Sequence, residues 1–592
     1  MTDTTSPGPR EVAKVLAEIG LLLELHGESS FRARAFTNAA RALEGLEADL
    51  QALAKQDRLT SLKGVGAGIA GVIKEFVLTG RSDLLEELTT KTPLGLYDLL
   101  RIPGLGPKRI HTLHQELGVD GLDALEEAAA AGKVAALSGF GAKTAAKIVE
   151  GIAFARASRR LRRYPQALEI AVTLLEGVRS VPEVTSAEIV GAVRRRMEIV
   201  DRIEMLAAAE HPVRAAEALR AVYGSAGEAA GAAAAAGAES LAQGEVILRL
   251  SDGVTARVRC VAREAFVAAT VWETGNAKHV GALADLAADR GLEFGKDGLR
   301  ADGKLVPLER ESELYDRLGL AYVPPELREG LGEVERAGSG ELPKLVELED
   351  LHGTFHCHTT YSDGKATIEE MGSAARDRGW SYLGLADHSR AAAYAGGLSI
   401  ERVRAQQAEI DGFNEAHSVS GATPFRIFKG IESDILPDGS LDYPDDVLGT
   451  FDYVVGSVHS AFGMARAEMT KRVIRAVKHP SLTILGHPTG RLLLRRDGYE
   501  IDIPAVLEAA ADAGVVIEIN ANPNRLDLDW RHVRTAAEMG IVIAINPDAH
   551  SVRELDNLAF GINMARKAGL EPRQVLNTWP LDEVTRYLAE RK

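Results

Sequence analysis

Imidazole and carboxylate side chains gather in the C-terminal part of this 592-residue sequence, where ten of the 15 histidines lie after residue 350. Nine such side chains stand at or soon after the ends of short apolar runs, at His356, His358, Asp363, His388, Glu432, His459, His487, Asp548 and His550. A single histidine is more often a packed or surface residue than a ligand. Here six separate runs would each need a coincidental ligand, so the set indicates metal binding.

The number and type of these side chains indicate a centre with more than one metal. One tetrahedral zinc accepts four ligands, so nine predict two or three divalent ions with at least one bridging carboxylate. Ligation by His, Asp and Glu without thiolate suits Zn, Mn or Fe. Cys357 lies between two ligands, and strand alternation should turn it away from them. Paired metals about 3.5–4 Å apart are the usual device for phosphate-ester hydrolysis.

Strands must position these side chains, and the sequence around them alternates between strand and helix patterns. Apolar runs recur at Tyr382–Ala386, Arg426–Gly430, Tyr453–Ser457, Thr483–Leu485, Val515–Ile519 and Ile541–Ile545. Helical patterns lie between most of them, for example at Ile400–Phe413 and Ile503–Ala513. The alternation predicts a parallel α/β sheet or barrel. In such a barrel the C-terminal strand ends meet on one face, so the nine side chains should converge there.

The motifs that carry these residues resemble the signature of the PHP (polymerase and histidinol phosphatase) family. They are His356-Cys-His358, Ser362-Asp363-Gly364, Ala386-Asp387-His388, Gly430-Ile-Glu432, Ser457-Val-His459, Gly486-His-Pro488 and Asp548-Ala-His550. The resemblance implies a seven-stranded β/α barrel with a trinuclear site. One metal would bind His356, His358, Glu432 and Asp548, a second Glu432, His459 and His487, and a third Asp363, His388 and His550.

Within that centre, the resemblance makes Glu432, Asp548 and His459 the catalytic metal-centre residues. Two nearby arginines, Arg491 and Arg525, could hold a substrate phosphate. A surface salt bridge is about as good an interpretation of each arginine.

Near the N-terminus, one glycine pattern occurs three times among short predicted helices at Arg10–Leu25, Phe31–Leu43 and Ala70–Leu78. Its glycine pairs are Gly64 and Gly66, Gly104 and Gly106, and Gly139 and Gly141, and the last two pairs are followed by Lys108 and Lys143. The copies resemble helix-hairpin-helix motifs, whose backbone amides hold a DNA phosphate. We expect DNA binding mainly at the second and third copies. The alternative is that the hairpins only pack helices together.

The middle of the chain is mixed. The pattern predicts a helix at Gln166–Val178, then strands at Ser186–Val190, Val246–Leu250 and Thr255–Val261, the last two joined at Asp252-Gly253. The Ala- and Gly-rich tract 226–238 predicts a loose helix or an insertion.

The whole chain resembles the bacterial family X DNA polymerases. Gly191-Ala-Val-Arg-Arg-Arg196 is similar to the start of the palm motif, and Thr274-Gly-Asn276 to part of the thumb. The resemblance implies a multidomain protein: 1–90 a helical N-terminal DNA-binding domain, 91–155 helix-hairpin-helix fingers, 156–265 an α+β nucleotidyltransferase-like palm, 266–335 the thumb, 336–346 a linker, and 347–592 the PHP barrel.

The palm motif departs from the family pattern where its chemistry lies. In register, Arg202 and Glu204 stand at two aspartate positions and Arg257 stands at the third. Nucleotidyl transfer needs carboxylates to hold two Mg²⁺ ions, and the two arginines would repel them. We therefore expect a degenerate palm, with Mg²⁺ bound only if the site is active. A shifted site that uses Asp201 and Glu204 is the alternative.

Together these features predict a cytoplasmic DNA-repair enzyme that acts as a metal-dependent 3′-5′ exonuclease or 3′-end phosphoesterase on gapped or 3′-ended duplex DNA. The net charge of −16 argues against a protein that binds DNA through a broad surface of lysines. It does not argue against local DNA contacts through backbone amides or metal ions. No apolar run is long enough to span a membrane, and two cysteines fit a reducing compartment. The alternatives are an active gap-filling polymerase with a proofreading barrel, and a small-molecule phosphoesterase.

Overall fold

The computed structural model describes residues 7–43, 46, 48–224, 235–241, 244–250, 254–417 and 424–591. The chain divides into two compact units, Met1–Arg159 and Arg160–Lys592. The finer domain boundaries predicted from the sequence stay predictions. Among the described residues, no helix is long and apolar enough to cross a membrane.

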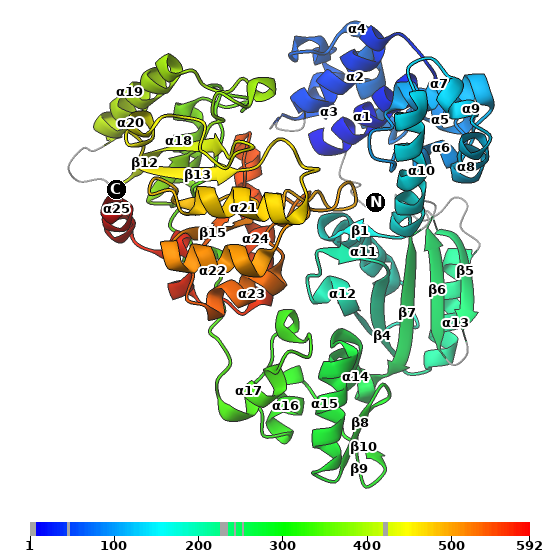
Figure 1. Ribbon diagram of the computed structural model, residues 1–592. Coiled ribbons are helices and arrows are strands. Elements are labelled where there is room, and N and C mark those ends of the chain that lie inside the picture. The colour runs from blue at the N-terminus through cyan, green and yellow to red at the C-terminus, as the bar shows by residue number, and fades with distance from the viewer. Residues whose placement is uncertain are drawn as a thin grey trace. The chain divides into compact units, whose positions relative to one another are not determined.

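The described part of the N-terminal unit contains helices and no strand (Figure 1). Its α-helices are α1 (Pro9–Leu25), α2 (Ser30–Leu43), α3 (Leu50–Lys55), α4 (Ala67–Thr79), α5 (Asp83–Lys91), α6 (Gly95–Leu99), α7 (Pro107–Leu117), α8 (Leu122–Ala130), α9 (Lys133–Ala136) and α10 (Gly141–Ser158). Apolar residues at helical spacing, such as Leu16, Ile19 and Leu23 of α1, are buried in one core. The three helices predicted here from apolar spacing are confirmed as α1, α2 and α4.

The second unit begins with an α+β region around a five-stranded sheet of order β2-β4-β7-β6-β5. Its elements are β1 (Arg162–Arg163), α11 (Tyr164–Arg179), β2 (Ser186–Val190), α12 (Gly191–Arg194), β3 (Ile199–Val200), β4 (Ile203–Ala209), α13 (Pro212–Gly224), β5 (Ala235–Leu241), β6 (Glu245–Leu250) and β7 (Thr255–Ala262). Strands β4 and β7 are parallel, whereas the other pairs in this sheet are antiparallel. The predicted helix and strands of this region are confirmed as α11, β2, β6 and β7.

The prediction for the Ala- and Gly-rich tract is wrong at its end. Residues 235–238 belong to β5, which pairs with β6 along its length. The remainder of the tract, 226–234, and the predicted turn at Asp252-Gly253 lie outside the described residues.

A smaller region with its own apolar core follows. It contains α14 (Phe266–Thr274), α15 (Ala277–Ala288), α16 (Glu311–Arg317), α17 (Glu333–Ser339) and a three-stranded antiparallel sheet of β8 (Leu292–Gly295), β9 (Gly298–Ala301) and β10 (Lys304–Leu305). Leu283, Leu314 and Tyr315 are fully buried in its core. Helix α17 continues to Ser339, so the predicted linker 336–346 begins inside a helix.

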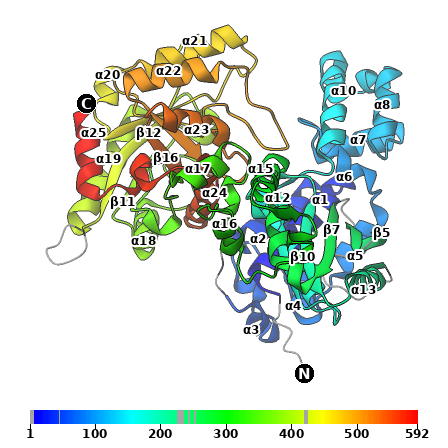
Figure 2. The ribbon, with the colours of Figure 1, turned by 90° about the horizontal axis from the view of Figure 1, so that it is seen from below.

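The C-terminal region is a sheet of six parallel strands in chain order, interleaved with helices. The strands are β11 (Tyr382–Leu385), β12 (Arg426–Asp434), β13 (Tyr453–Ser457), β14 (Ile484–Leu485), β15 (Val516–Asn520) and β16 (Ile543–Asn546). The helices are α18 (Ile368–Asp377), α19 (Ile400–His417), α20 (Asp445–Leu448), α21 (Arg466–Val477), α22 (Ile503–Ala513), α23 (Trp530–Glu538), α24 (Leu558–Ala568) and α25 (Leu581–Glu590). Figure 2 shows strands such as β11, β12 and β16 inside a ring of these helices, so the predicted alternation is confirmed.

Local signals set the ends of these helices. Helix α22 starts after Asp502, whose side chain accepts a hydrogen bond from the Ala505 N–H at 3.3 Å. It ends at Gly514, which takes the left-handed φ of +63° that glycine allows.

The two edges of the six-stranded sheet are joined by the segment 354–358. On the β11 side, the Gly384 N–H donates to the Thr354 carbonyl at 2.7 Å. On the β16 side, the His358 N–H donates to the Ala549 carbonyl at 2.8 Å. The described segment forms an isolated bridge rather than a regular strand, and the seven-stranded barrel implied by the family resemblance stays a prediction.

Candidate metal centre

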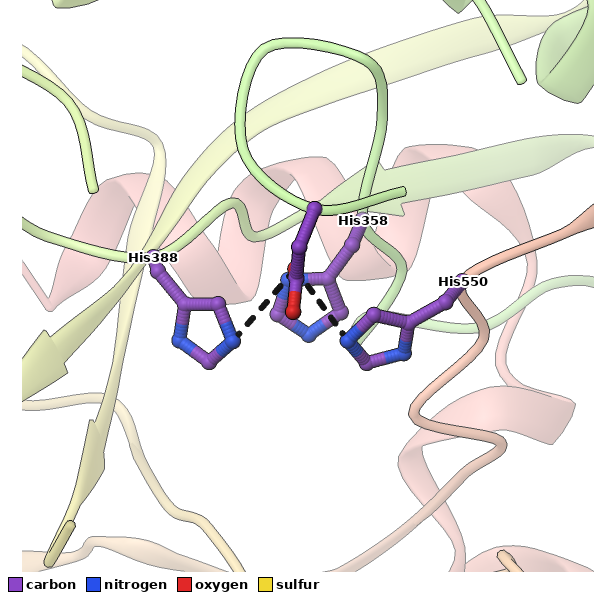
Figure 3. A group of neighbouring side chains, drawn as sticks. His358, His388 and His550 are labelled. Atoms are coloured by element: carbon purple, nitrogen blue, oxygen red, sulfur yellow. Dashed lines mark ion pairs between the residues drawn. The ribbon is translucent and has the colours of Figure 1, made fainter. Parts of the chain in front are cut away.

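All nine predicted ligands come together at the C-terminal ends of the parallel strands. His388 follows β11, Glu432 lies in β12, His459 follows β13, His487 follows β14, Asp548 and His550 follow β16, and His356, His358 and Asp363 precede α18. Figure 3 shows His358, His388 and His550 directed toward one common region. The fold therefore collects side chains from across almost 200 residues of sequence into one site.

Glu432 lies among four of the histidines. Its carboxylate oxygens are 2.8 Å from His388 Nδ1, 2.9 Å from His487 Nε2, 3.2 Å from His459 Nε2 and 3.4 Å from His356 Nε2. A bridging carboxylate needs ligands of two metals close to its oxygens. Glu432 meets this condition because several predicted ligands surround it.

The ligand atoms form three overlapping groups, each within 4.8 Å: His358, Asp363, His388 and His550; His356, His358 and Asp548; and His388, Glu432 and His459. The family resemblance assigned His358 and His388 to one metal each. In the structure, each of these two histidines belongs to two groups. The geometry alone therefore does not divide His358 and His388 between separate metals in the way that the family resemblance implies.

Buried atoms of this centre fit a set of bound cations. His356 Nε2, both ring nitrogens of His358 and His487 Nδ1 are buried and make no hydrogen bond with the residues that the structure describes. A buried polar atom without a partner costs about 1–3 kcal/mol. Divalent ions would give these nitrogens partners, and a set of imidazoles and carboxylates without thiolate suits Zn, Mn or Fe.

Charges within the centre shift its pKa values in both directions: despite burial, nearby carboxylates raise the pKa of His459 to about 10 and that of His550 to about 9. Burial acts to raise the pKa of Glu432, but His459, His388 and His356 outweigh it and hold the pKa well below its usual value. The same balance, led by His356, holds the pKa of Asp548 well below its usual value. Burial, together with His550 and His388, lowers the pKa of His358 to about 3. Both carboxylates are therefore ionised and His358 is neutral at physiological pH.

Two further carboxylates orient the ligands. Glu518 Oε1 lies 2.7 Å from His356 Nδ1, and its Oε2 accepts a hydrogen bond from the His487 N–H at 2.7 Å. Asp434 Oδ1 lies 3.1 Å from His459 Nδ1. Such partners fix the tautomer and the ring orientation of a ligand. Neither residue was predicted from the sequence, although an acidic residue inside an otherwise apolar strand pattern is a signal that indicates Glu518.

The two arginines proposed for phosphate binding take different places. Arg525 Nε lies 3.5 Å from Asp548 Oδ2, at the metal centre. Arg491 instead donates to the Arg525 carbonyl at 3.0 Å and pairs with Asp529 at 2.8 Å. Arg491 therefore holds the backbone that carries Arg525 rather than reaching the centre itself.

Cys357 is buried in an apolar cluster that includes Met371 and Leu385. Strand alternation turns it away from the ligands, as the sequence indicated.

The three residues predicted to replace the palm aspartates, Arg202, Glu204 and Arg257, also lie together and form ion pairs. Glu204 on β4 is in register with Arg257 on β7. Glu204 Oε1 lies 3.3 Å from Arg257 Nη2 and 3.0 Å from Arg202 Nη2. Arg257 also pairs with Glu273 and, at 3.5 Å, with Glu245. Burial acts to lower the pKa of Arg257, but Glu273, Glu204 and Glu245 outweigh it and raise that pKa.

The described residues of the predicted palm form no cluster comparable to the one in the C-terminal region. Across the part of the chain that the structure describes, groups of three or more His, Cys, Asp or Glu ligand atoms within 4.8 Å occur only in that C-terminal region.

At each of the three glycine hairpins, no side chain that the structure describes covers the backbone where a helix begins. Gly64 and Gly104 have left-handed φ angles of +81° and +78°, and Gly66 and Gly106 cap the N-termini of α4 and α7. The third copy differs, because Gly139 has a φ of +84° and Gly141 is itself the first residue of α10. A Cβ added at any of these six glycines would meet no atom within 4 Å, and Lys108 and Lys143 are exposed.

Family models match four stretches of the chain. They are a helix-hairpin-helix domain at residues 8–82, a SAM-like helix-hairpin-helix tandem at 96–153, a DNA polymerase beta thumb at 269–329 and a PHP domain at 354–522. The first match includes the first hairpin, and the second includes the other two.

A relative from Bacillus subtilis (strain 168), named DNA polymerase/3′-5′ exonuclease PolX, is 36% identical over 587 residues, which cover 98% of this chain and 99% of the relative. The chain belongs to the family X DNA polymerases that carry a PHP domain. Two shorter relatives match its C-terminal part. A probable phosphatase of Thermoanaerobacter sp. (strain X514) is 29% identical over 250 residues, covering 40% of this chain and 94% of the relative. A probable phosphatase of Caldanaerobacter subterraneus is 32% identical over 179 residues, covering 28% of this chain and 66% of the relative.

Proposed function

We propose that this family X protein is a metal-dependent DNA hydrolase whose PHP domain acts at DNA 3′ ends, and whose palm does not transfer nucleotides. The observation that carries the proposal is the contrast between two sites. In one site, eight of the nine predicted ligands form overlapping groups and the ninth, His487, lies 2.9 Å from Glu432. In the other site, arginines pair with the carboxylates. The name of the Bacillus subtilis relative supports a 3′-5′ exonuclease.

In the PHP centre, the nine ligands would hold two or three divalent ions, with Glu432 shared between them. Ions bound there supply Lewis-acid activation of water and neutralise negative charge on a phosphate ester. Asp434 and Glu518 keep His459 and His356 in place through their Nδ1 atoms. Arg525 would bind a phosphate oxygen beside the centre, since a guanidinium donates charge-assisted hydrogen bonds to phosphate.

In the palm, the electrostatics oppose the binding of Mg²⁺. Arg257 lies among Glu204, Glu245 and Glu273, so the negative charge that would attract a cation is already paired. Two Mg²⁺ ions would have to displace these ion pairs and approach two guanidinium groups. We therefore infer that the palm serves as a scaffold, and that the helix-hairpin-helix domains bind DNA through their open backbone amides.

A second function has specific support. Relatives that match only the PHP region carry the name probable phosphatase, which favours a phosphoesterase that acts on small molecules. An active gap-filling polymerase has weaker support, because it rests on the name of the Bacillus subtilis relative and on a shifted site that uses Asp201 and Glu204.

The proposal is tested with purified protein, Mn²⁺ and a gapped duplex whose upstream strand carries a 5′ label, with and without dNTPs. We expect the labelled strand to shorten from its 3′ end and not to be extended. Glu432→Ala should abolish shortening, because it removes the carboxylate that four histidines contact. Arg202→Ala is the control in the palm and should leave shortening unchanged.

Two results would overturn the proposal. Strand extension that is lost in Glu204→Ala would demonstrate an active palm. Hydrolysis of a small phosphate ester that excess DNA does not inhibit, with no strand shortening, would favour the small-molecule phosphoesterase.

A further inference from the structure

An exposed aromatic side chain stands beside the metal centre and plays no part in it. The ring of Tyr394 is centred 6.3 Å from the ring of His388 and 6.5 Å from that of His459. The residue is nonetheless 75% exposed. Single exposed apolar residues are common on protein surfaces, so exposure alone carries no argument. An exposed aromatic ring directly beside two predicted metal ligands is less common, and its position suggests a role at the site.

The turn that carries Tyr394 is short and well anchored. The ring projects from a 3₁₀ turn, η5 (Ala393–Ala395), which follows β11 and precedes α19. The Leu398 N–H donates to the His388 carbonyl at 2.9 Å, and the Ala391 N–H donates to Asp442 Oδ2 at 2.6 Å. The turn is thus tied to a metal ligand and to the loop after β12. A ring held in this way loses little freedom when something packs on it.

The surroundings leave the ring uncovered. Residues 391–397 are all alanine or glycine apart from Tyr394, and Ala392 and Ala395 are buried beneath the turn. No bulky neighbour in the turn can fold over the aromatic face. The small side chains therefore leave room for a flat group to stack on it.

A cation for a phosphate lies at the same centre. Arg525 lies 3.5 Å from the ligand Asp548, and its charge also acts on Tyr394. A cation that binds a phosphate and a neutral aromatic face that binds a base are together what proteins use to hold single-stranded nucleic acid.

We propose that Tyr394 is the stacking platform for the base of the 3′-terminal nucleotide, so that the centre prefers nucleotide ends to small phosphate esters. The inference rests on the proposed DNA hydrolase function and adds the residue that selects the substrate. Base–aromatic stacking tolerates any sequence, because every base has an aromatic face. Stacking on Tyr394 should therefore favour 3′ ends that carry a base over abasic ends. It should not distinguish between the four bases.

The test compares two duplexes that differ only at the 3′ terminus, where one carries a nucleotide and the other a tetrahydrofuran abasic residue. Tyr394→Leu should lower kcat/KM on the nucleotide end by about 5–150-fold and leave kcat/KM on the abasic end unchanged. Tyr394→Phe, which keeps the ring, should retain the activity of the unmodified protein on both ends. Because the side chain is exposed, these variants should fold, and circular dichroism checks that they do.

A binding measurement gives a readout that does not depend on hydrolysis. In the Glu432→Ala background, 2-aminopurine at the 3′ terminus should be quenched on binding, and adding Tyr394→Leu should remove the quenching. Equal losses on nucleotide and abasic ends, or no loss on either, would overturn the stacking proposal, as would quenching that survives Tyr394→Leu. If the unmodified protein shortens neither duplex, the proposed function fails instead, and the quenching experiment still decides the role of Tyr394.

Discussion

At the scale of single residues, the metal centre depends on side chains that would touch no metal. Glu518 is fully buried, and both of its oxygens are engaged, one with His356 Nδ1 and Asn546 and the other with the His487 N–H. Its charge favours the imidazole tautomer that leaves His356 Nε2 free to bind a metal.

We predict that Glu518→Gln weakens metal binding by roughly 10–100-fold, because the amide cannot match the charge that orients His356. Titration with a competing chelator and elemental analysis measure the affinity. Glu538→Gln is a suitable control, since Glu538 is an exposed partner of Arg534 on the outer helix α23. Equal metal affinity in both variants would contradict the orienting role of Glu518.

The convergence of the predicted ligands could be predicted from sequence, but their grouping could not. Six of the nine lie in or just after strands β11 to β16, whose apolar pattern is visible in the chain, and parallel strands bring such residues to one edge. The place of His358 and His388 in two groups each depends on side-chain directions, and two other predicted ligands take backbone conformations that the sequence does not reveal. His487 and Asp548 have left-handed φ angles of 25° and 51°. Such angles cost non-glycine residues about 1–3 kcal/mol each and are set by the surrounding fold, so no local pattern indicates them.

At the scale of elements, the hairpins offer a controlled test of DNA binding. Gly66 and Gly106 have φ angles of −81° and −83°, which any residue can adopt. Gly8 has almost the same backbone, with a φ of −79°, and also caps a helix, α1, without a preceding glycine hairpin. All three have open space where a Cβ would stand, so a valine at each should be similarly tolerated by the fold.

We predict that Gly66→Val and Gly106→Val weaken DNA binding, because the added side chain keeps phosphate away from the hairpin amides. The slope of log K against log salt should become shallower by about 0.9 for each phosphate that the protein no longer binds. Fluorescence anisotropy at several salt concentrations measures both quantities. Gly8→Val should bind as the unmodified protein does, and equal binding by all three variants would mean that the hairpins only pack helices.

Helices and strands whose apolar residues recur at a regular spacing could be predicted from the sequence. Elements without such a spacing could not. Strands β11 to β16 and helix α22 carry apolar residues at the spacing of their own structure. Strand β5 begins in a tract of alanine and glycine, where apolar and polar residues do not alternate. Its strand conformation is stabilised by pairing with β6. Helix α17 extends into the predicted linker, where the run Ala337-Gly-Ser-Gly340 has the composition of a loop.

At the scale of the whole second unit, consecutive arginines of the palm motif connect its regions. Arg195 pairs with Glu329 at 3.0 Å. Arg196 lies 3.3 Å from Glu326 and donates to the Asn563 side chain on α24 at 2.6 Å. The motif that resembles the start of the palm motif thus contacts the thumb, through Glu326 and Glu329, and helix α24, through Asn563. These contacts give the motif a structural role that does not depend on nucleotidyl transfer.

Lys567 on α24 is the most buried cation in these contacts. It is 2% exposed, its Nζ lies 2.6 Å from Glu329 Oε1 and 4.7 Å from the centre of the Trp530 ring, and it donates to the Arg195 carbonyl at 3.0 Å. Burial lowers the pKa of Lys567, although Glu329 opposes the shift. Removing one partner of a buried pair typically costs about 3–5 kcal/mol, because the other charge is left buried.

We therefore predict that Lys567→Met lowers the free energy of unfolding of this unit, toward the lower end of that ~3–5 kcal/mol range, because Arg195 still pairs with Glu329. Urea unfolding followed by tryptophan fluorescence measures the change. Adding Glu329→Gln should deepen the loss, since Arg195 then loses its carboxylate partner as well. Arg573→Met is the surface control: its partner Glu571 lies 2.7 Å away, but the arginine side chain is 80% exposed, and such pairs contribute little. A loss in Lys567→Met no larger than in Arg573→Met would mean that the buried lysine does not hold the palm, the thumb and the PHP domain together.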